Sequence, residues 1–116
     1  MVETEYRLDE SRTITIAANG IGFVANVGPA KAGERWEITN TSVSATGRCE
    51  FASYRGNQPV ANRQIDFTFT GDGDSSDTVI SLKPQETVTF AFTGTPGIIG
   101  TVVITGTRYV PGKRAY

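Results

Sequence analysis

Apolar and polar residues alternate along most of this chain with a period of two. The clearest case is residues 87–93, where Val88, Phe90 and Phe92 alternate with small, mostly hydroxylated residues. This spacing places the large side chains on one face of an extended strand and the small ones on the other. No segment keeps the apolar period of a helix over two full turns. The pattern therefore predicts an all-β protein.

Short segments of this kind recur along the chain, with glycine, proline or asparagine between them. We expect strands at residues 12–17, 21–27, 34–44, 48–55, 65–70, 78–82, 87–93 and 98–109. Asn19-Gly20 favours a two-residue type I′ hairpin turn between the first two strands, and residues 60–64 permit a short helical turn. About eight or nine strands in two facing antiparallel sheets would bury one apolar face of each sheet. The sequence predicts a single-domain β-sandwich, either jelly-roll-like or immunoglobulin-like.

Alternation also indicates which side chains share a face. In the strand at 34–44, the odd spacing from Ile38 to Val43 requires a bulge if both residues join Trp36 in the core. In three other strands, the residues assigned to one face are Ile14 and Ile16, Cys49 and Phe51, and Ile65, Phe67 and Phe69.

The length of 116 residues corresponds to one ordinary domain. We expect residues 12–110 to form the sandwich, residues 1–11 to form an N-terminal arm or an edge strand, and residues 111–116 to form a C-terminal tail. The first segment is acidic and the last is basic. Opposite charges of this kind can pair within one chain or between subunits, although exposed pairs contribute only about 0–1 kcal/mol each.

Composition argues against several classes of function. The net charge is −1, which gives no electrostatic basis for binding nucleic acid or an anionic membrane. Histidine is absent, so the commonest general base and transition-metal ligand is missing. Cys49 is the only cysteine and cannot form an intrachain disulfide; we expect it to be a small buried residue. We identify neither a basic-then-apolar leader nor an apolar run long enough to span a membrane.

Two groups of carboxylates are candidates for chemistry. Asp72, Asp74 and Asp77 lie in a glycine-rich loop and resemble the start of a calcium loop, but the closing glutamate is missing because Leu82 and Lys83 occupy that region. The alternative is a solvated turn whose side chains bond their own backbone. A glycosidase-like pair could be sought in Glu34 with Glu37, or Glu50 with Asp66, but no spacing selects either pair. We therefore expect no catalytic residue, no cofactor and no enzymatic activity.

Tyrosine and arginine are enriched at protein interfaces, and they lie near both ends of this chain. Tyr54 is also a candidate for stacking on a sugar. The residues that we expect to contribute to an interface are Glu3, Glu5, Tyr6, Leu8, Tyr54, Arg55, Arg108, Tyr109, Lys113, Arg114 and Tyr116.

Three segments together carry a resemblance to a known class of protein. They are residues 33–38 (GERWEI), the loop from Thr70-Gly71 to Asp77-Thr78, and residues 82–107, which begin LKPQE. Over roughly residues 12–110 the chain resembles small all-β virion proteins of tailed bacteriophages, of the head decoration or minor capsid type. The resemblance implies a non-enzymatic β-sandwich that binds the outside of the capsid, often as a trimer. It supplies no functional residues.

We therefore expect a virion protein made in the host cytoplasm and located on the capsid surface. Its partners would be the lattice of the major capsid protein and further copies of the chain, with a trimer favoured, and neither nucleic acid nor membrane. One alternative is a tail- or fibre-associated module that binds a host-surface glycan. Another is a carbohydrate-binding or calcium-dependent adhesion module unconnected with a phage.

Overall fold

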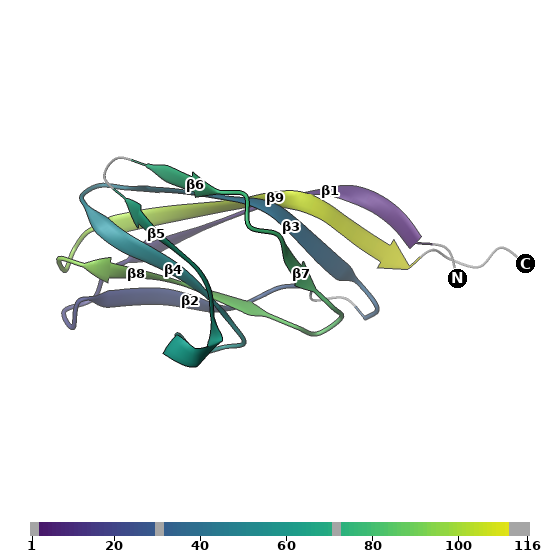
Figure 1. Cartoon of the computed structure of the whole chain (residues 1–116), viewed down its shortest axis with the longest axis horizontal. Helices are drawn as coiled ribbons and strands as arrows, with labels where there is room; N and C mark the ends of the chain where they lie inside the picture. Colours follow the sequence, from purple (N-terminus) through teal and green to yellow (C-terminus); the bar gives the residue numbers. More distant parts are fainter. Residues whose placement is uncertain (1–2, 30–31, 71–72, 112–116) are drawn as a thin grey trace, which may run out of the picture.

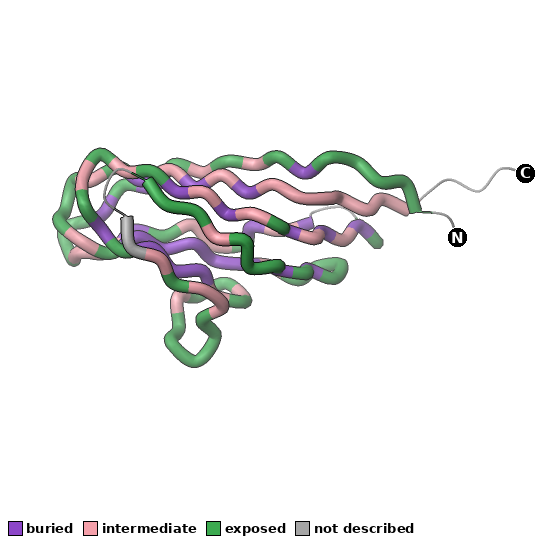
Figure 2. The backbone as a smooth tube through the Cα atoms, turned by 45° about the horizontal axis from the view of Figure 1, so that its top comes forward, coloured by how far each residue is buried: buried purple, intermediate pink, exposed green. Residues whose placement is uncertain are grey.

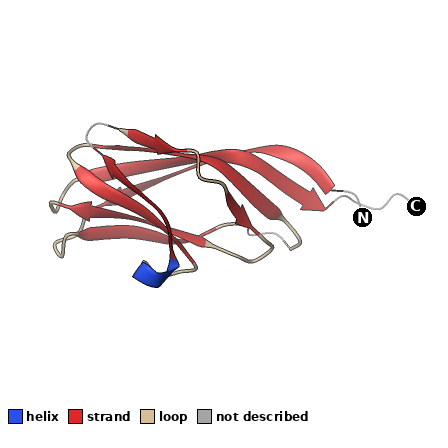
Figure 3. Ribbon diagram, in the orientation of Figure 1, coloured by secondary structure: helices blue, strands red, loops and turns tan. Residues whose placement is uncertain are grey.

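A computed structural model of the chain describes residues 3–29, 32–70 and 73–111 (Figure 1). Within these residues nine strands form two antiparallel sheets, and the one helical segment is a short 3-10 turn (Figure 3). The all-β sandwich expected from the sequence is confirmed. The elements are β1 (Glu3–Thr15), β2 (Ile21–Val27), β3 (Arg35–Ala45), β4 (Cys49–Arg55), η1 (Ala61–Arg63), β5 (Gln64–Thr70), β6 (Asp74–Ser76), β7 (Ile80–Leu82), β8 (Val88–Gly94) and β9 (Ile99–Pro111).

The strand order is that of a jelly roll rather than an immunoglobulin domain. Sheet A has the order β1-β9-β3-β6, with β7 also paired to β3, and sheet B has the order β2-β8-β4-β5. The chain crosses between the sheets at most connections, so that β4 and β5 are the consecutive strands that pair with each other. This winding distinguishes between the two architectures that the sequence left open.

The core lies between the sheets and consists of the inward sets of alternating residues. Phe90 and Phe92 of β8 are 0 % exposed, and Cys49 is buried as expected. In β3, Trp36, Ile38 and Val43 are all buried, because the register with β9 shifts between Ile38 and Asn40. The bulge inferred from the spacing of these residues is therefore confirmed.

The hairpin expected at Asn19-Gly20 is wrong. β1 pairs with β9 in sheet A and β2 pairs with β8 in sheet B, so this turn carries the chain from one sheet to the other. A type I′ turn needs positive φ at both central residues, and here Gly20 has it (φ 85°) but Asn19 does not. The Asn19 side chain instead accepts a hydrogen bond from the Ile21 amide, at 3.2 Å. The Asn-Gly pair marked a turn correctly but not the strands that the turn would pair.

The outer face of sheet B carries an aromatic row. Phe67 lies on the outer side because Thr68, not Phe67, is opposite the buried Phe51. Register across the sheet then aligns Phe23, Ala91, Ala52 and Phe67 in one row. The two phenylalanines are 46 % and 51 % exposed, while the alanines between them are buried. Phe67 is thus directed away from the core, whereas Ile65, at the shift in register between β5 and β4, is half-buried and packs against the core. The single face predicted for Ile65 and Phe67 is therefore wrong, and the side chain of Phe69 lies outside the described residues.

β1 and β9 form a long ribbon that extends beyond sheet B, and β3 flanks β9 along it as far as the pair Arg35–Tyr109 (Figure 1). Of the two alternatives for the first segment, the structure has an edge strand over Glu3–Thr15, and no element boundary lies between residues 11 and 12. Exposed residues predominate along this strand (Figure 2). In the part of the chain that the structure describes, no helix is long and apolar enough to cross a membrane.

Candidate functional site

The free end of the ribbon brings together most of the residues expected to form an interface. We call this region, residues 3–8 of β1 and 106–111 of β9, the ribbon end. Register places Glu5 opposite Tyr109 and Tyr6 opposite Arg108. Pairing of the first strand with the last therefore joins residues that are far apart in the sequence.

One face of the ribbon end, the outer face of sheet A, is organised by Arg35 of β3. Its Nε and Nη2 donate hydrogen bonds to the two carboxylate oxygens of Glu3, at 2.9 and 3.1 Å. Its guanidinium carbon lies 3.8 Å from the centroid of the Tyr109 ring. A bidentate pair combined with a cation–π contact fixes a planar guanidinium more firmly than either contact alone. This cluster therefore presents an ordered aromatic and charged surface to solvent.

The opposite face of the ribbon end holds a second arginine. Arg108 lies 5.3 Å from the centroid of the Tyr6 ring, and its Nε lies 3.3 Å from Oε1 of Glu34. Trp36 Nε1 donates a hydrogen bond to the same oxygen at 3.4 Å. Among the described residues, the buried Nε of Arg108 has no hydrogen-bond partner, so its attraction to Glu34 is that of an ion pair. Tyr6 is 48 % exposed, although it lies on the same face of β1 as the buried Leu8.

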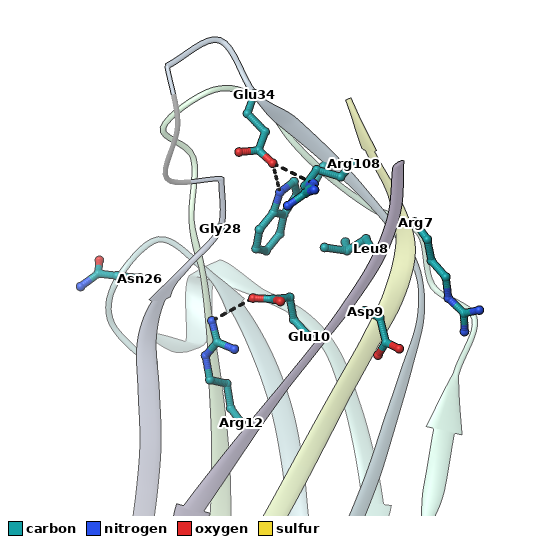
Figure 4. Close-up of a pocket in the computed structure, with 10 residues that line it drawn as sticks. Arg7, Leu8, Asp9, Glu10, Arg12, Asn26, Gly28, Glu34 and Arg108 are labelled. Carbon is teal, nitrogen blue, oxygen red and sulfur yellow. Dashed lines mark hydrogen bonds and ion pairs between the residues drawn. The ribbon is translucent and has the colours of Figure 1, made fainter. Parts of the chain in front are cut away.

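A cavity of about 520 Å³ lies beside this second cluster (Figure 4). Leu8, Glu10 and Arg12 of β1 point into it, with Glu34 on the other side, whereas Arg7 and Asp9 point away. Arg12 pairs with Glu10 at 3.5 Å. The remaining charged side chains that line the cavity are two arginines, Arg12 and Arg108, and two glutamates, Glu10 and Glu34, so their charges balance. The cavity therefore selects neither a cationic nor an anionic ligand.

Sequence reasoning missed three residues of this region: Glu34, Arg35 and Trp36. Trp36 was assigned to the core, and Glu34 was considered only as a partner for Glu37. No local signal connects Arg35 with Glu3, because the contact depends on β3 and β1 flanking the same strand, β9. A partial signal was the run Glu34-Arg35-Trp36, which concentrates a carboxylate, a cation and an aromatic ring at the start of a strand.

Other expected interface residues lie elsewhere. Tyr54 and Arg55 are on β4 in sheet B, and Arg55 Nη1 donates a hydrogen bond to the carbonyl of Ser81 at 3.4 Å. Leu8 is 2 % exposed, and its side chain packs in the core rather than at the surface. The remaining three lie outside the described residues: Lys113, Arg114 and Tyr116.

The candidate calcium loop shows the hydrogen bonding of a surface turn. Asp74 accepts hydrogen bonds from the Thr68 hydroxyl and the Ser75 amide, and Asp77 accepts one from Asn40 at 2.9 Å. Asp72 lies outside the described residues. Over residues 3–29, 32–70 and 73–111, no group of three or more metal-ligating side chains of His, Cys, Asp or Glu is present.

The structure does not bring either candidate carboxylate pair together. Glu34 is buried beside Trp36, whereas Glu37 is on the opposite face of β3 by the alternation of the strand. Asp66 is opposite the buried Ser53, so it faces the inside of the sandwich, and Glu50 faces outward. The arrangement that a glycosidase needs, two carboxyl groups on one face, is therefore not formed by these residues.

The Glu3–Arg35 pair predicts a measurable pH dependence. The hydrogen bonds from Arg35 hold the pKa of the Glu3 carboxyl below its ordinary value of 4.5. Their contribution to folding is present above that ordinary value and is lost as the pH falls through the lower pKa of the folded state. We expect Arg35→Gln to raise the pKa of Glu3, as measured by NMR titration of its side-chain carboxyl. Arg12→Gln is the control and should leave that pKa unchanged; an unchanged value in Arg35→Gln would contradict the geometry.

The buried carboxylate beside Trp36 predicts a stability effect. Glu34→Gln keeps an acceptor for the indole N–H but removes the charge opposite Arg108, which is then left partly buried and unpaired. We expect the free energy of unfolding to fall by about 1–2 kcal/mol, because Arg108 is partly exposed and solvent screens the loss. Urea unfolding followed by the fluorescence of Trp36 measures it. Glu37→Gln, on the opposite face, should change stability by less than about 0.5 kcal/mol.

Comparisons with known proteins identify the fold but not a family. No protein-family model matches the sequence, and no curated protein matches it. A solved structure from Bacillus endospore appendages, which form disulfide-linked pili, matches with a TM-score of 0.54 and 16 % identity, covering 97 % of this chain and 93 % of the other. A second match, with a TM-score of 0.48 and 10 % identity, is a chain of the virus-like particle of extra small virus, from the giant freshwater prawn Macrobrachium rosenbergii. It covers 97 % of this chain and 84 % of the other. At 16 % identity, the likeness to the Bacillus structure shows a shared fold alone.

Proposed function

We propose that this chain is a non-enzymatic structural protein of a tailed bacteriophage that binds the outside of the capsid as a decoration or minor capsid protein. The observation that supports the proposal is the ribbon end, which extends beyond sheet B and, together with Glu34 and Arg35 at the start of β3, presents an arginine, a tyrosine and a glutamate on each face. Tyrosine and arginine are the residues that most often dominate binding at interfaces. A rigid body with one ordered, protruding surface suits a protein that docks on a repeating lattice.

Many copies on a symmetric shell turn a weak single contact into stable retention, because neighbouring copies bind together. The major capsid protein would provide the lattice, and the resemblance favours a trimer of this chain. The fold is compatible with a role in a large assembly, since a chain of the same fold builds the Bacillus pili. Those pili are linked by disulfides, whereas Cys49 is buried here. We therefore propose that this chain assembles without covalent links.

Binding to purified empty heads tests the proposal. The wild-type chain should saturate the heads at a stoichiometry set by the symmetry of the lattice. Tyr6→Ala and Tyr109→Ala should each weaken binding at least about tenfold, while Phe23→Ala, which removes an exposed aromatic ring from the other sheet, should not. Heads that bind no wild-type protein would contradict the function, and full binding by both tyrosine variants would contradict the role of the ribbon end.

A second candidate function is supported by the aromatic row on sheet B. Phe23 and Phe67 flank a floor formed by Ala91 and Ala52, and Tyr54 lies on the same face of β4. Flat aromatic surfaces stack on sugar rings, so this face suits a tail- or fibre-associated module that binds a host glycan. A glycan array probed with the wild-type chain and with Phe67→Ala tests it. An array without wild-type signal, or with equal signal from both proteins, would contradict this candidate.

A further inference from the structure

We infer that the open edge of β1 is an interface between two copies of this chain. The two β1 strands would pair in an antiparallel, two-fold arrangement, with Leu8 opposite Leu8 of the partner subunit and Arg7 opposite the partner's Asp9. Sheet A would then continue from one copy into the other. This inference concerns contact between copies and does not rest on the proposed capsid function. It puts a two-fold dimer in place of the trimer that the resemblance favours.

The hydrogen bonding of the structure shows that β1 has a free edge. In sheet A, β1 pairs with β9 alone among the described strands. Directly after this ladder, the Ile16 amide donates to the Ile98 carbonyl at 2.9 Å. The register of β1 with β9 is continuous from Thr15 back to Glu3. In an antiparallel ladder hydrogen-bonded and non-hydrogen-bonded pairs alternate. Even-numbered residues of β1 therefore bond β9, and odd-numbered residues from Glu3 to Thr13 direct their N–H and C=O groups to the open edge.

A second hydrogen bond, at the end of the strand, supports this assignment of even-numbered residues to β9 and odd-numbered residues to the open edge. The amide of Ala17, the next odd-numbered residue after Thr15, donates to the carbonyl of Ile21 at 3.2 Å rather than to β9. A second β1 strand centred on Leu8 would place odd-numbered residues opposite odd-numbered residues. Every outward backbone group from Glu3 to Thr13 would then find a partner, which is the general basis of strand addition.

Each possible two-fold register is defined by the residue of β1 that lies opposite itself at the symmetry axis. Among these registers, charge favours the one centred on Leu8. Centres at Glu5, Arg7, Asp9 or Glu10 place that charged residue opposite itself, which is destabilising. A centre at Tyr6 places Glu3 opposite the partner's Asp9, again with like charges. With Leu8 at the centre, Arg7 and Asp9 oppose each other twice and no like charges meet. The remaining opposed residues are Glu3 with Thr13, Thr4 with Arg12, Glu5 with Ser11, and Tyr6 with Glu10.

A centre at Ser11 also avoids like charges, but it is the weaker solution. It would pair fewer residues of the exposed part of β1, and its opposite charges, Glu10 and Arg12, already form an ion pair within one chain. Arg7 and Asp9, in contrast, make no hydrogen bond or ion pair with the part of the chain that the structure describes. Both are exposed and point away from the cavity (Figure 4). The Leu8-centred register gives both of them partners.

An alternative role for these charges is to keep the edge from pairing at all. The two explanations differ in what a charge swap does. If the charges only repel other strands, then exchanging Arg7 and Asp9 has no effect on association. If they select the register, then each single reversal weakens the contact and the exchange restores it. A two-fold contact also closes after two copies, so it yields dimers and not fibres.

Sedimentation equilibrium of the full chain at low ionic strength tests the inference. The wild type should be a dimer, and Arg7→Asp or Asp9→Arg, which each create two like-charge pairs, should weaken it at least about tenfold. The Arg7→Asp/Asp9→Arg double variant should recover to within about threefold of wild type. An equimolar mixture of the two single variants should form a heterodimer. Glu5→Arg is the matched control, since it faces the neutral Ser11 in this register.

A backbone variant tests the edge without relying on charge. Ser11→Pro removes an outward N–H but leaves the ladder with β9 intact, so it should give a folded monomer with an unchanged circular-dichroism spectrum. A wild-type chain that stays monomeric up to about 1 mM, or that forms the trimer implied by the resemblance, would overturn the inference. Failure of the double variant to recover, or dimerisation of folded Ser11→Pro, would also overturn it. No capsid is present in these measurements, so their failure is distinct from failure of the proposed function.

Discussion

Phe92→Ala is expected to lower the free energy of unfolding by about 3–5 kcal/mol. Phe92 is 0 % exposed, and its ring centroid lies 5.1 Å from that of Phe51. Its ring packs directly over Gly100 of the facing sheet, where a Cβ atom would lie 2.6 Å away. Because glycine offers no side chain to move into the space, the cavity left by the substitution cannot be filled from that side. Urea unfolding followed by circular dichroism measures the loss.

Phe23→Ala is the matched control for this prediction. Phe23 lies on the other face of the same sheet, opposite Ala91, and is 46 % exposed. We expect a loss of less than about 1 kcal/mol, because the removed ring is already half in water. Similar losses in the two variants would mean that the sheets do not pack on the faces described.

Gly106→Ala is expected to lower the free energy of unfolding by about 3 kcal/mol or more. Gly106 lies on β9 between Leu8 of β1 and Ile38 of β3. A Cβ atom there would lie 2.0 Å from the carbonyl oxygen of Glu37 and 3.0 Å from the amide of Thr39. Both contacts are with backbone at the bulge of β3, which cannot rotate away as a side chain can. Calorimetry should show a correspondingly lower melting temperature.

Gly73→Ala is the control for the added methyl group itself. The nearest atom to a Cβ at Gly73 is the carbonyl oxygen of Val43 at 3.4 Å, an ordinary contact. Its effect should stay within about 0.5 kcal/mol. If Gly106→Ala lowered the free energy of unfolding as little as Gly73→Ala, then the bulge of β3 would not lie against Gly106 of β9 as described.

The strands of the core could be predicted because each has one face buried against the other sheet. β3 shows how far this goes: the odd spacing from Ile38 to Val43 was enough to predict the bulge that the structure contains. β8 was equally clear, with Val88, Phe90 and Phe92 all buried. In these strands successive side chains point to opposite faces of the sheet, so the residues that alternate in the sequence as apolar are the ones that are buried.

The first part of β1 has no comparable pattern in the sequence, because the ribbon extends beyond sheet B. There the core-facing side carries Tyr6 in partial contact with solvent, and neither face needs to be apolar. A strand exposed on both faces loses the alternation by which it would be recognised. The segment expected to be an arm or an edge strand is, over residues 3–11, an edge strand whose pairing with β9 left no trace in the local sequence.

The candidate site depends on strand order, which the local pattern does not encode. Glu3 contacts Arg35 because their strands, β1 and β3, flank β9 on either side. Arg108 contacts Glu34 because β9 is next to β3 in the same sheet. The hairpin expected at Asn19-Gly20 failed for a related reason, since a turn propensity does not specify which sheet receives the next strand. Residue type was enough to propose interface candidates, but the sequence did not show which of these residues would be neighbours in the fold.

The pairing of β1 with β9 also determines when this protein can become folded during synthesis. The strands of sheet B, from β2 to β8, have all been made before β9 leaves the ribosome. Sheet A, in contrast, has β9 between β1 and β3, so its first strand must wait for its last one. Contacts between the ends of a chain slow folding because a long loop has to close before they form. Until β9 has left the ribosome, β1 and β3 lack the strand that joins them, so the core-facing side of sheet B is not fully covered. This is the interval in which a chaperone would bind the nascent chain.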